Sequence, residues 1–248
     1  MRQITILPGT DKAGNAEPFD SIALNSGDML AVVGGTGSGK SRFIKDIEQL
    51  VSGDSVTRRR ILLDGSEVAI EERINTSTRL IAHLGQNMRF VLDAEVLEFI
   101  RIHMDCRGQT GFAPEAVLDL ANTMTPEKIH GGQNLTTLSG GQTRALMIAD
   151  VAMVCQSPVV LVDEIENAGI DKSLALKVLT GSGKIIIVVT HDPHTALLCE
   201  RRIRIENGAV RQSMNRSRDE EIQLGQLEEQ YTLQNNLRDN LRKGVSLI

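Results

Sequence analysis

The chain has 248 residues, a formal net charge of -5, 41% hydrophobic residues and 24% charged residues. This composition is typical of a globular protein with one large domain, or with a core and an inserted subdomain. The charge excludes a global bias towards nucleic acid and leaves only a locally basic face open. Apolar runs such as Ile185–Val189 are far shorter than the roughly 20 residues that cross a bilayer, so we expect no direct membrane span.

The N-terminus and the cysteines bear on the compartment. Met1–Pro8 holds one Arg and an alternating Ile4/Ile6 pattern where a secretory signal would need a continuous apolar core. We therefore expect a cytoplasmic protein, with peripheral attachment at the inner face of the membrane left open. Three cysteines without zinc or disulfide spacing are expected to be reduced thiols: Cys106, Cys155 and Cys199.

Short apolar, β-branched runs alternate with longer stretches of helical periodicity, which predicts an α/β fold with a mainly parallel sheet flanked by helices. The strands expected in chain order are Ile4–Leu7, Ser21–Leu24, Met29–Val33, Ile61–Leu63, Leu80–Leu84, Val159–Val162 and Ile185–Val189. Two further runs, Arg201–Ile205 and Ala209–Arg211, flank Asn207-Gly208, which is a type I′ hairpin signal. The sheet is therefore expected to end in an antiparallel margin.

Two regions depart from this alternation. Residues 87–138 lose the strand signal and carry amphipathic runs such as Ala94–Arg107, which predicts an inserted helical subdomain. The core is then expected to comprise residues 1–86 and 139–212. Residues 213–248 are polar, with one apolar stripe that predicts a helical tail: Ile222, Leu224, Leu227, Tyr231, Leu237 and Leu241. Packing on its own domain is favoured for this tail, and self-association or partner docking is the alternative.

The strand Met29–Val33 runs directly into a G-x-x-x-x-G-K-[ST] loop that precedes a helix. Its glycines let backbone N–H groups face phosphate oxygens, Lys40 reaches the β- and γ-phosphates, and the Ser41 hydroxyl ligates Mg²⁺. The expected nucleotide-binding residues are Gly34, Gly35, Thr36, Gly37, Ser38, Gly39, Lys40, Ser41 and the following Arg42. The loop predicts a bound nucleoside triphosphate, with ATP and Mg²⁺ as the expected cofactors.

The buried strand Val159–Val162 leads into Asp163 and Glu164, at the sheet edge where open α/β sheets bind ligands. Asp163 is suited to holding Mg²⁺ through water, and Glu164 to activating the attacking water. An acidic pair at a strand end can also be a solvated edge. Its place in the same chain as the phosphate loop favours the catalytic interpretation.

A second anion site is expected where Leu138-Ser139-Gly140-Gly141-Gln142 opens the apolar helix Thr143–Val154. An ordinary helix N-cap is the alternative reading of Ser139. One nucleotide does not need two cradles from one small subunit. A head-to-tail homodimer, in which each copy offers its second cradle to the nucleotide of the other, accounts for both.

These motifs resemble the ATP-binding cassette (ABC) ATPases over about residues 21–210. The resemblance implies a P-loop NTPase core and identifies Gly34–Ser41 as the Walker A loop, Leu138–Gln142 as the family signature, and Val159–Glu164 as the Walker B strand. It further implies that Gln86 is the Q-loop residue that senses Mg²⁺ and water. His191 resembles the switch histidine at the γ-phosphate, and Asp171 the D-loop aspartate that reports across the dimer. The resemblance thus assigns catalytic roles to Glu164, His191, Lys40 and Gln86.

The chain also departs from the family pattern. The segment Asp163–Asp171 lacks the proline usual after the glutamate and is one residue longer than the common form. No aromatic residue stands where the family stacks one on the adenine, with Phe19 the nearest candidate. The sequence therefore predicts contacts to the phosphates of the nucleotide more clearly than contacts to its base.

Two functions stay open at this point. The favoured one is the cytoplasmic energy-coupling subunit of a membrane transporter, because Gln142 follows Ser-Gly-Gly and Gln86 leads into the helical subdomain. The other is a soluble ATPase of the same family that acts on a protein or nucleic-acid partner, which the altered Asp163–Asp171 segment and the polar tail favour. A regulatory ATP sensor with little turnover is disfavoured because the base Glu164 is present.

Overall fold

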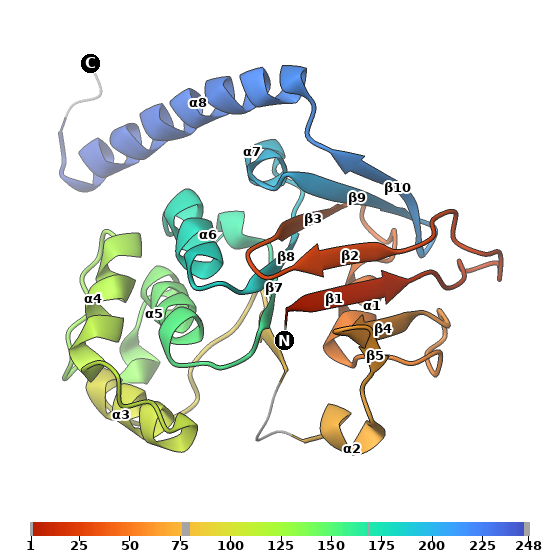
Figure 1. The fold of residues 1–248 in the computed structure, drawn as a ribbon. Coiled ribbons are helices and arrows are strands. Elements are labelled where there is room, and N and C mark those ends of the chain that lie inside the picture. The colour runs from red at the N-terminus through yellow and green to blue at the C-terminus, as the bar shows by residue number, and fades with distance from the viewer. Residues whose placement is uncertain (1, 76–79, 168, 246–248) are drawn as a thin grey trace.

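A six-stranded sheet lies at the centre of the molecule, and the computed structural model describes residues 2–75, 80–167 and 169–245 of the chain (Figure 1). Ala168 of the predicted Asp163–Asp171 segment and the last three residues of the predicted tail lie outside these ranges. The strands in these ranges are β1 Gln3–Leu7, β2 Ile22–Asn25, β3 Met29–Val33, β4 Arg60–Leu63, β5 Ser66–Glu67, β6 Ile81–Leu84, β7 Val159–Asp163, β8 Ile185–Val189, β9 Arg201–Glu206 and β10 Ala209–Asn215. The α-helices of the described part of the chain are α1 Lys40–Glu48, α2 Ile70–Arg73, α3 Val96–Arg107, α4 Pro114–Met124, α5 Gly140–Met153, α6 Lys172–Gly181, α7 Pro193–Leu198 and α8 Arg218–Arg242.

The strand order of the central sheet is β10-β9-β3-β8-β7-β6. Strands β9, β3, β8, β7 and β6 are parallel, and β10 pairs antiparallel with β9. All five residues of β8 are buried, as expected for a strand covered on both faces. The predicted α/β class, with a mainly parallel sheet and an antiparallel margin, is confirmed.

The turn of the β9–β10 hairpin has the predicted geometry. Asn207 and Gly208 both have positive φ, 52° and 82°, as a type I′ turn requires. Strand β10 continues to Asn215, beyond the expected Arg211, and its pairing with β9 is interrupted by a bulge between Val210 and Gln212.

The N-terminal strands form a second, wholly antiparallel sheet in the order β2-β1-β4-β5. The expected strands Ile4–Leu7, Ser21–Leu24 and Ile61–Leu63 are therefore present but lie outside the mainly parallel sheet. Ile4 and Ile6 are buried while their neighbours in β1 are half-buried, which is the alternation of a sheet covered on one face. Strand β5 was not predicted because its two residues, Ser66 and Glu67, are polar and exposed.

Helices α3, α4 and α5 lie together beyond β6 and β7 (Figure 1). In α3 the predicted inner residues Val96, Ile100 and Met104 are buried. Within the described residues, every helix is either too short or too polar to cross a bilayer.

Helix α8 crosses the molecule above α7 (Figure 1). The prediction that its apolar residues form a single stripe was wrong. At 100° per residue its apolar side chains spread over an arc of about 200°, which is too wide for one buried stripe. Leu224, Leu227 and Tyr231 are partly buried. Ile222 and Leu241 are 59% and 61% exposed. Only the first set faces the body of the protein.

Candidate functional site

Four neighbouring parallel strands, in the order β3-β8-β7-β6, deliver the predicted site residues to one edge of the sheet. The phosphate loop follows β3 and His191 follows β8. Asp163 ends β7, and Gln86 lies two residues beyond the end of β6. The carboxyl ends of parallel strands meet at one edge, so residues far apart in sequence converge there.

The phosphate loop needs glycine at two tightly packed positions. A Cβ on Gly34, whose φ is 154°, would lie 2.4 Å from the Ile205 carbonyl oxygen. A Cβ on Gly39, whose φ is 112°, would lie 2.7 Å from the Gly208 Cα. The loop is therefore pressed against the β9–β10 hairpin. The same contact is seen in the Gly208 N–H, which donates to the Ser38 carbonyl at 2.7 Å.

Lys40, the first residue of α1, lies across this loop. Its Nζ donates to the carbonyl oxygens of Gly34 at 2.7 Å and Gly35 at 3.0 Å. The helix start has no side-chain cap, which leaves its backbone N–H groups available for an anion. Three other loop residues, Gly35, Thr36 and Gly37, are exposed, and so is Ser41.

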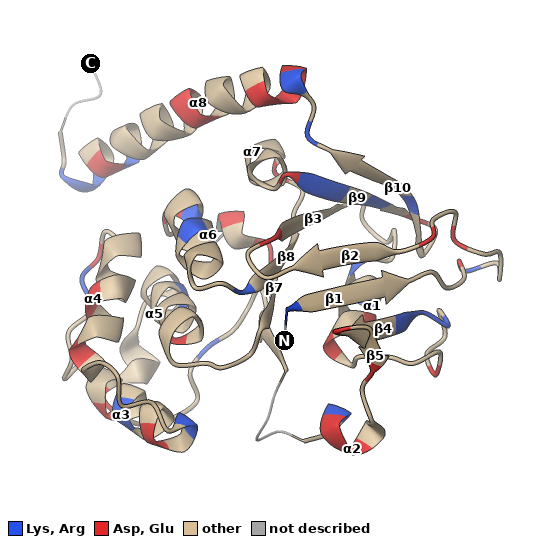
Figure 2. Cartoon of the chain, in the orientation of Figure 1, with Lys and Arg blue, Asp and Glu red and all other residues tan. Residues whose placement is uncertain are grey.

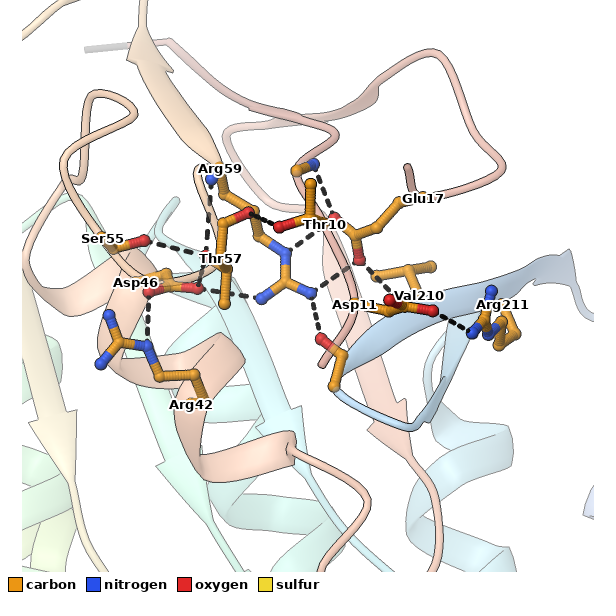
Figure 3. Close-up of polar contacts among 12 residues, drawn as sticks. Thr10, Asp11, Glu17, Arg42, Asp46, Ser55, Thr57, Arg59, Val210 and Arg211 are labelled. Carbon is orange, nitrogen blue, oxygen red and sulfur yellow. Dashed lines mark hydrogen bonds and ion pairs between the residues drawn. The ribbon is translucent and has the colours of Figure 1, made fainter. Parts of the chain in front are cut away.

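A buried ion network that no sequence pattern predicted is centred on Arg59 (Figure 3). The Arg59 guanidinium is fully buried and pairs with Glu17 at 2.6 Å and Asp46 at 2.9 Å. It also donates to the Gly208 carbonyl at 2.6 Å. Asp46 in turn accepts from Arg42 Nε at 3.0 Å. The network thus joins α1 to the hairpin turn that packs on the phosphate loop.

The carboxylate of Glu164 lies between two other predicted catalytic residues. Gln86 Nε2 donates to Glu164 Oε2 at 2.6 Å, and His191 Nδ1 lies 3.6 Å from Glu164 Oε1. Glu164 itself has a φ of 47°. Non-glycine residues rarely adopt this conformation, and those that do are often found at functional sites. The structure therefore brings Glu164, Gln86 and His191 together.

Asp163 is next to this group and half-buried. Burial, and then the neighbouring Glu164 charge, raise the pKa of Asp163 above its ordinary range. A cation beside these carboxylates would relieve the repulsion.

Two more residues hold the strand ends and were not singled out from the sequence. Arg144 of α5 donates to the Gly85 carbonyl and, at 2.7 Å, to the Asp163 carbonyl. Glu166 accepts from Thr190 Oγ1 at 2.8 Å and lies 3.5 Å from His191 Nδ1. The available signals were a charge inside the apolar run Thr143–Val154 and a second acid two residues after Glu164.

The second predicted anion site lies at the start of α5. Ser139 forms a capping box: its Oγ accepts from the Gln142 N–H at 3.3 Å, and its own N–H donates to Gln142 Oε1 at 2.9 Å. Gly140 and Gly141 line a groove of about 570 Å³ together with Gln86 and Glu164. Among the described residues that line this groove, none belongs to the phosphate loop. The N-cap and the anion site use different atoms, so both readings of Ser139 remain compatible.

The predicted Mg²⁺ ligands offer a hydroxyl from Ser41, an amide from Gln86 and a carboxylate from Asp163, and these oxygen donors suit Mg²⁺. The described part of the chain holds no cluster of three His, Cys, Asp or Glu side chains suited to a metal. Mg²⁺ commonly uses one or two carboxylates together with substrate phosphates, so this donor set fits it.

Comparison with known proteins gives one consistent result. The family model described as ABC transporter matches residues 20–167. The chain is 46% identical over 249 residues to an uncharacterized ABC transporter ATP-binding protein of Methanocaldococcus jannaschii, covering 100% of this chain and 95% of that relative. It is 30% identical to the phosphonates import ATP-binding protein PhnC of Stutzerimonas stutzeri, covering 80% of this chain and 79% of the relative.

Solved structures agree at the level of the fold. An ATP-binding subunit of an ABC transporter matches with a TM-score of 0.65 and 20% identity, over 87% of this chain and 90% of the other. The dimeric post-hydrolysis ATP-binding cassette MJ0796, bound to ADP and Pi, matches with a TM-score of 0.59 and 22% identity, over 86% and 98%. The resemblance drawn from the motifs is confirmed by these comparisons: the chain belongs to the ATP-binding proteins of the ABC transporter family and is an ATPase.

Proposed function

We propose that this ATPase works as an ATP-dependent, head-to-tail homodimer and that it couples hydrolysis to a separate transmembrane permease subunit. The dimer is supported by two helix N-termini of one chain, that of α1 after the phosphate loop and that of α5 after Ser139. Lys40 donates to a carbonyl of its own phosphate loop, while Gly140 and Gly141 line a groove whose described residues include none of that loop. A second copy, turned head to tail, supplies the signature segment Ser139–Gln142 to the other copy's phosphates.

In this proposal the groups around Glu164 activate water. The Glu164 carboxylate accepts a proton from the attacking water, and the Gln86 amide holds that carboxylate in place at 2.6 Å. His191 is 64% exposed and free to turn towards the γ-phosphate when a nucleotide is bound. Lys40 moves from the loop carbonyls to the β- and γ-phosphates.

Mg²⁺ is part of the same proposal. Ser41, Gln86 and Asp163 would hold it beside the nucleotide. When bound, it would neutralise charge on the β- and γ-phosphates.

The coupling to a membrane subunit is supported by the stretch that contains Gln86 and continues to residue 93. We name it the Gln86 segment (residues 85–93). Three of its apolar side chains are exposed: Met88 at 40%, Val91 at 96% and Leu92 at 46%. Apolar side chains grouped at a surface mark interaction sites. The same segment contacts the catalytic carboxylate through Gln86, so a helix that docks on it is linked to hydrolysis.

The charge distribution favours a protein partner over nucleic acid. Short stretches of Lys and Arg and of Asp and Glu are scattered along the whole ribbon, with one longer basic stretch at β9 (Figure 2). The most basic strand, β9, has partners for each of its arginines: Arg201 donates to the Ala23 carbonyl, Arg202 pairs with Glu220, and Arg204 pairs with Glu206. Paired arginines are poorly suited to neutralising phosphates.

The predicted division of the chain belongs to this proposal. Residues 1–86 and 139–212 form the ATPase core, 87–138 the helical subdomain that receives the permease, and 213–248 the tail. The cytoplasmic location follows from the permease, which would hold the subunit at the inner face of the membrane.

A membrane fractionation experiment tests the coupling. When the protein is expressed with its natural neighbours, we expect the wild type in the membrane fraction together with an integral membrane protein. Val91→Asp places a charge in the docking surface and should release the chain while its own ATPase activity persists. Val56→Asp changes a valine that is 79% exposed outside the Gln86 segment, and should leave the attachment intact. A wild type that stays in the soluble fraction and captures no membrane protein contradicts the coupling.

A further inference from the structure

Tyr231 on the inner side of α8 contacts two loops that leave the sheet edge. Its Oη accepts a hydrogen bond from the Lys172 backbone N–H at 3.1 Å and lies 3.5 Å from Asp171 Oδ1. Its ring lies 4.8 Å from the Lys172 ammonium and 4.9 Å from the His194 ring. One side chain of the tail therefore touches the start of α6 and the start of α7.

The two loops are also joined to each other by Lys172, which is 7% exposed. Its ammonium pairs with the Asp192 carboxylate. Asp171 caps α6 by accepting from the Leu174 N–H at 3.1 Å, and Asp192 caps α7 by accepting from the Thr195 N–H at 2.8 Å. Lys172 thus links the capping residues of two helices, and the Tyr231 ring covers the link.

The Tyr231 phenol also satisfies a backbone group that helices leave unpaired. The Lys172 N–H is the first of α6 and has no acceptor inside the helix. Loss of the phenol oxygen would leave this donor without its partner, in a position that is largely screened from water.

His194 completes the contact as a neutral ring. It is 4% exposed, and burial together with the Lys172 charge lowers the pKa of His194 from its ordinary value. Within the described residues neither ring nitrogen has a hydrogen-bond partner. The ring packs against Tyr231 as an apolar surface, which fixes the start of α7 against the tail.

We propose that Tyr231 is a positioning residue for ATP hydrolysis, because it holds the Asp171 loop and the His191 loop in one arrangement from the C-terminal helix. The inference rests on the proposed roles of Asp171 at the dimer contact and His191 at the γ-phosphate. His191 is directly followed by Asp192, the residue that Lys172 holds. The tail then controls the rate of hydrolysis without touching the nucleotide.

Steady-state hydrolysis by the full-length protein tests this assignment. Tyr231→Ala should lower kcat by about tenfold to a hundredfold, as expected when reacting groups are misplaced. The KM for ATP should stay within about twofold, because the interactions that bind the nucleotide are retained. A merely structural role would lower the melting temperature and leave kcat of the folded fraction unchanged.

Tyr231→Phe supplies a second variant that keeps the ring over Lys172 and His194. It removes only the phenol oxygen and should lower kcat by about fivefold, the worth of one hydrogen bond. Amide hydrogen exchange at Lys172 should become faster in this variant. Leu233→Ala is the matched control on the same helix, since Leu233 is 60% exposed and should leave both kcat and exchange unchanged.

The outcomes separate this inference from the proposed function. If the wild type hydrolyses ATP as a dimer and both Tyr231 variants match its kcat, the inference is overturned and the proposed function stands. If the wild type neither hydrolyses ATP nor dimerises with it, the proposed function itself fails. Slower exchange or a higher KM at constant kcat would also overturn the positioning role.

Discussion

The phosphate loop and the start of α5 are both glycine-bearing turns that lead into a helix, yet the chain supports them in opposite ways. Gly34 and Gly39 press on the β9–β10 hairpin, and a Cβ at either position would collide with backbone. A Cβ at Gly140 would meet nothing within 4 Å. The phosphate loop is thus held in shape by contacts within its own chain, while the start of α5 presents an open surface that a second copy would cover in the proposed dimer.

The largest effect is expected on ATP binding, from a change in the phosphate loop. Lys40→Ala removes the ammonium that we propose binds the phosphates, and should weaken ATP binding by at least about 100-fold, or about 2.7 kcal/mol. Equilibrium binding of a fluorescent ATP analogue measures this loss. Affinity equal to the wild type would show that Gly34–Ser41 does not bind the phosphates.

Replacing Glu164 should lower the rate of hydrolysis by a factor similar to the loss of affinity expected for Lys40→Ala. Glu164→Gln keeps the size of the side chain and removes the base, so kcat should fall about 10²- to 10⁴-fold while ATP binding persists. Single-turnover hydrolysis with labelled ATP checks this prediction. Retained turnover would assign the base to another residue, with Glu166 the nearest acid to His191.

The contribution of the buried Arg59 network to stability can be measured separately from ATP binding and hydrolysis. Arg59→Ala leaves Glu17 and Asp46 as buried carboxylates without their shared partner and should reduce the free energy of unfolding by about 3–5 kcal/mol. Arg60→Ala is the control, because its pair with Glu67 is largely exposed and should contribute less than about 1 kcal/mol. Denaturant unfolding of both variants measures the difference. Equal losses would refute the role of the buried network.

The smallest expected effect is a pH dependence at His194. Because burial lowers its pKa, the unfolded chain takes up a proton near pH 6.5 that the folded chain refuses, so stability falls as pH drops through and below this value. His194→Phe removes the titrating group and keeps a ring against Tyr231. Melting temperatures at pH 7.5 and 5.5 should therefore differ less in the variant than in the wild type. An unchanged pH dependence would contradict the buried, neutral state of His194.

Local patterns were enough to predict the parts of the fold and site that depend on neighbouring residues. The nine runs expected as strands all form strands, because each carries its own apolar or β-branched sequence. Asn207-Gly208 predicted its turn for the same reason. The phosphate loop and the Asp163-Glu164 pair were found because their chemistry is contiguous in the chain.

Features that depend on distant contacts could not be predicted. Arg59 meets Glu17 across 42 positions and Gly208 across 149, and no local signal marks an arginine that will be buried. The apolar residues of α8 fit one stripe at a loose spacing of three and four. Only their packing against the body shows that Tyr231 faces inward while Leu241 faces solvent.

The most direct test of the account is the mass of Glu164→Gln in solution with ATP and Mg²⁺, because this variant should bind ATP without hydrolysing it. Light scattering should give about twice the 27.1 kDa of one chain with ATP, and one chain with ADP. Adding Gly140→Asp should return the ATP-bound protein to a single chain that still binds ATP, since this side chain has room in the monomer and would repel the phosphates of the second copy. A Glu164→Gln protein that binds ATP and remains a single chain would contradict the composite site.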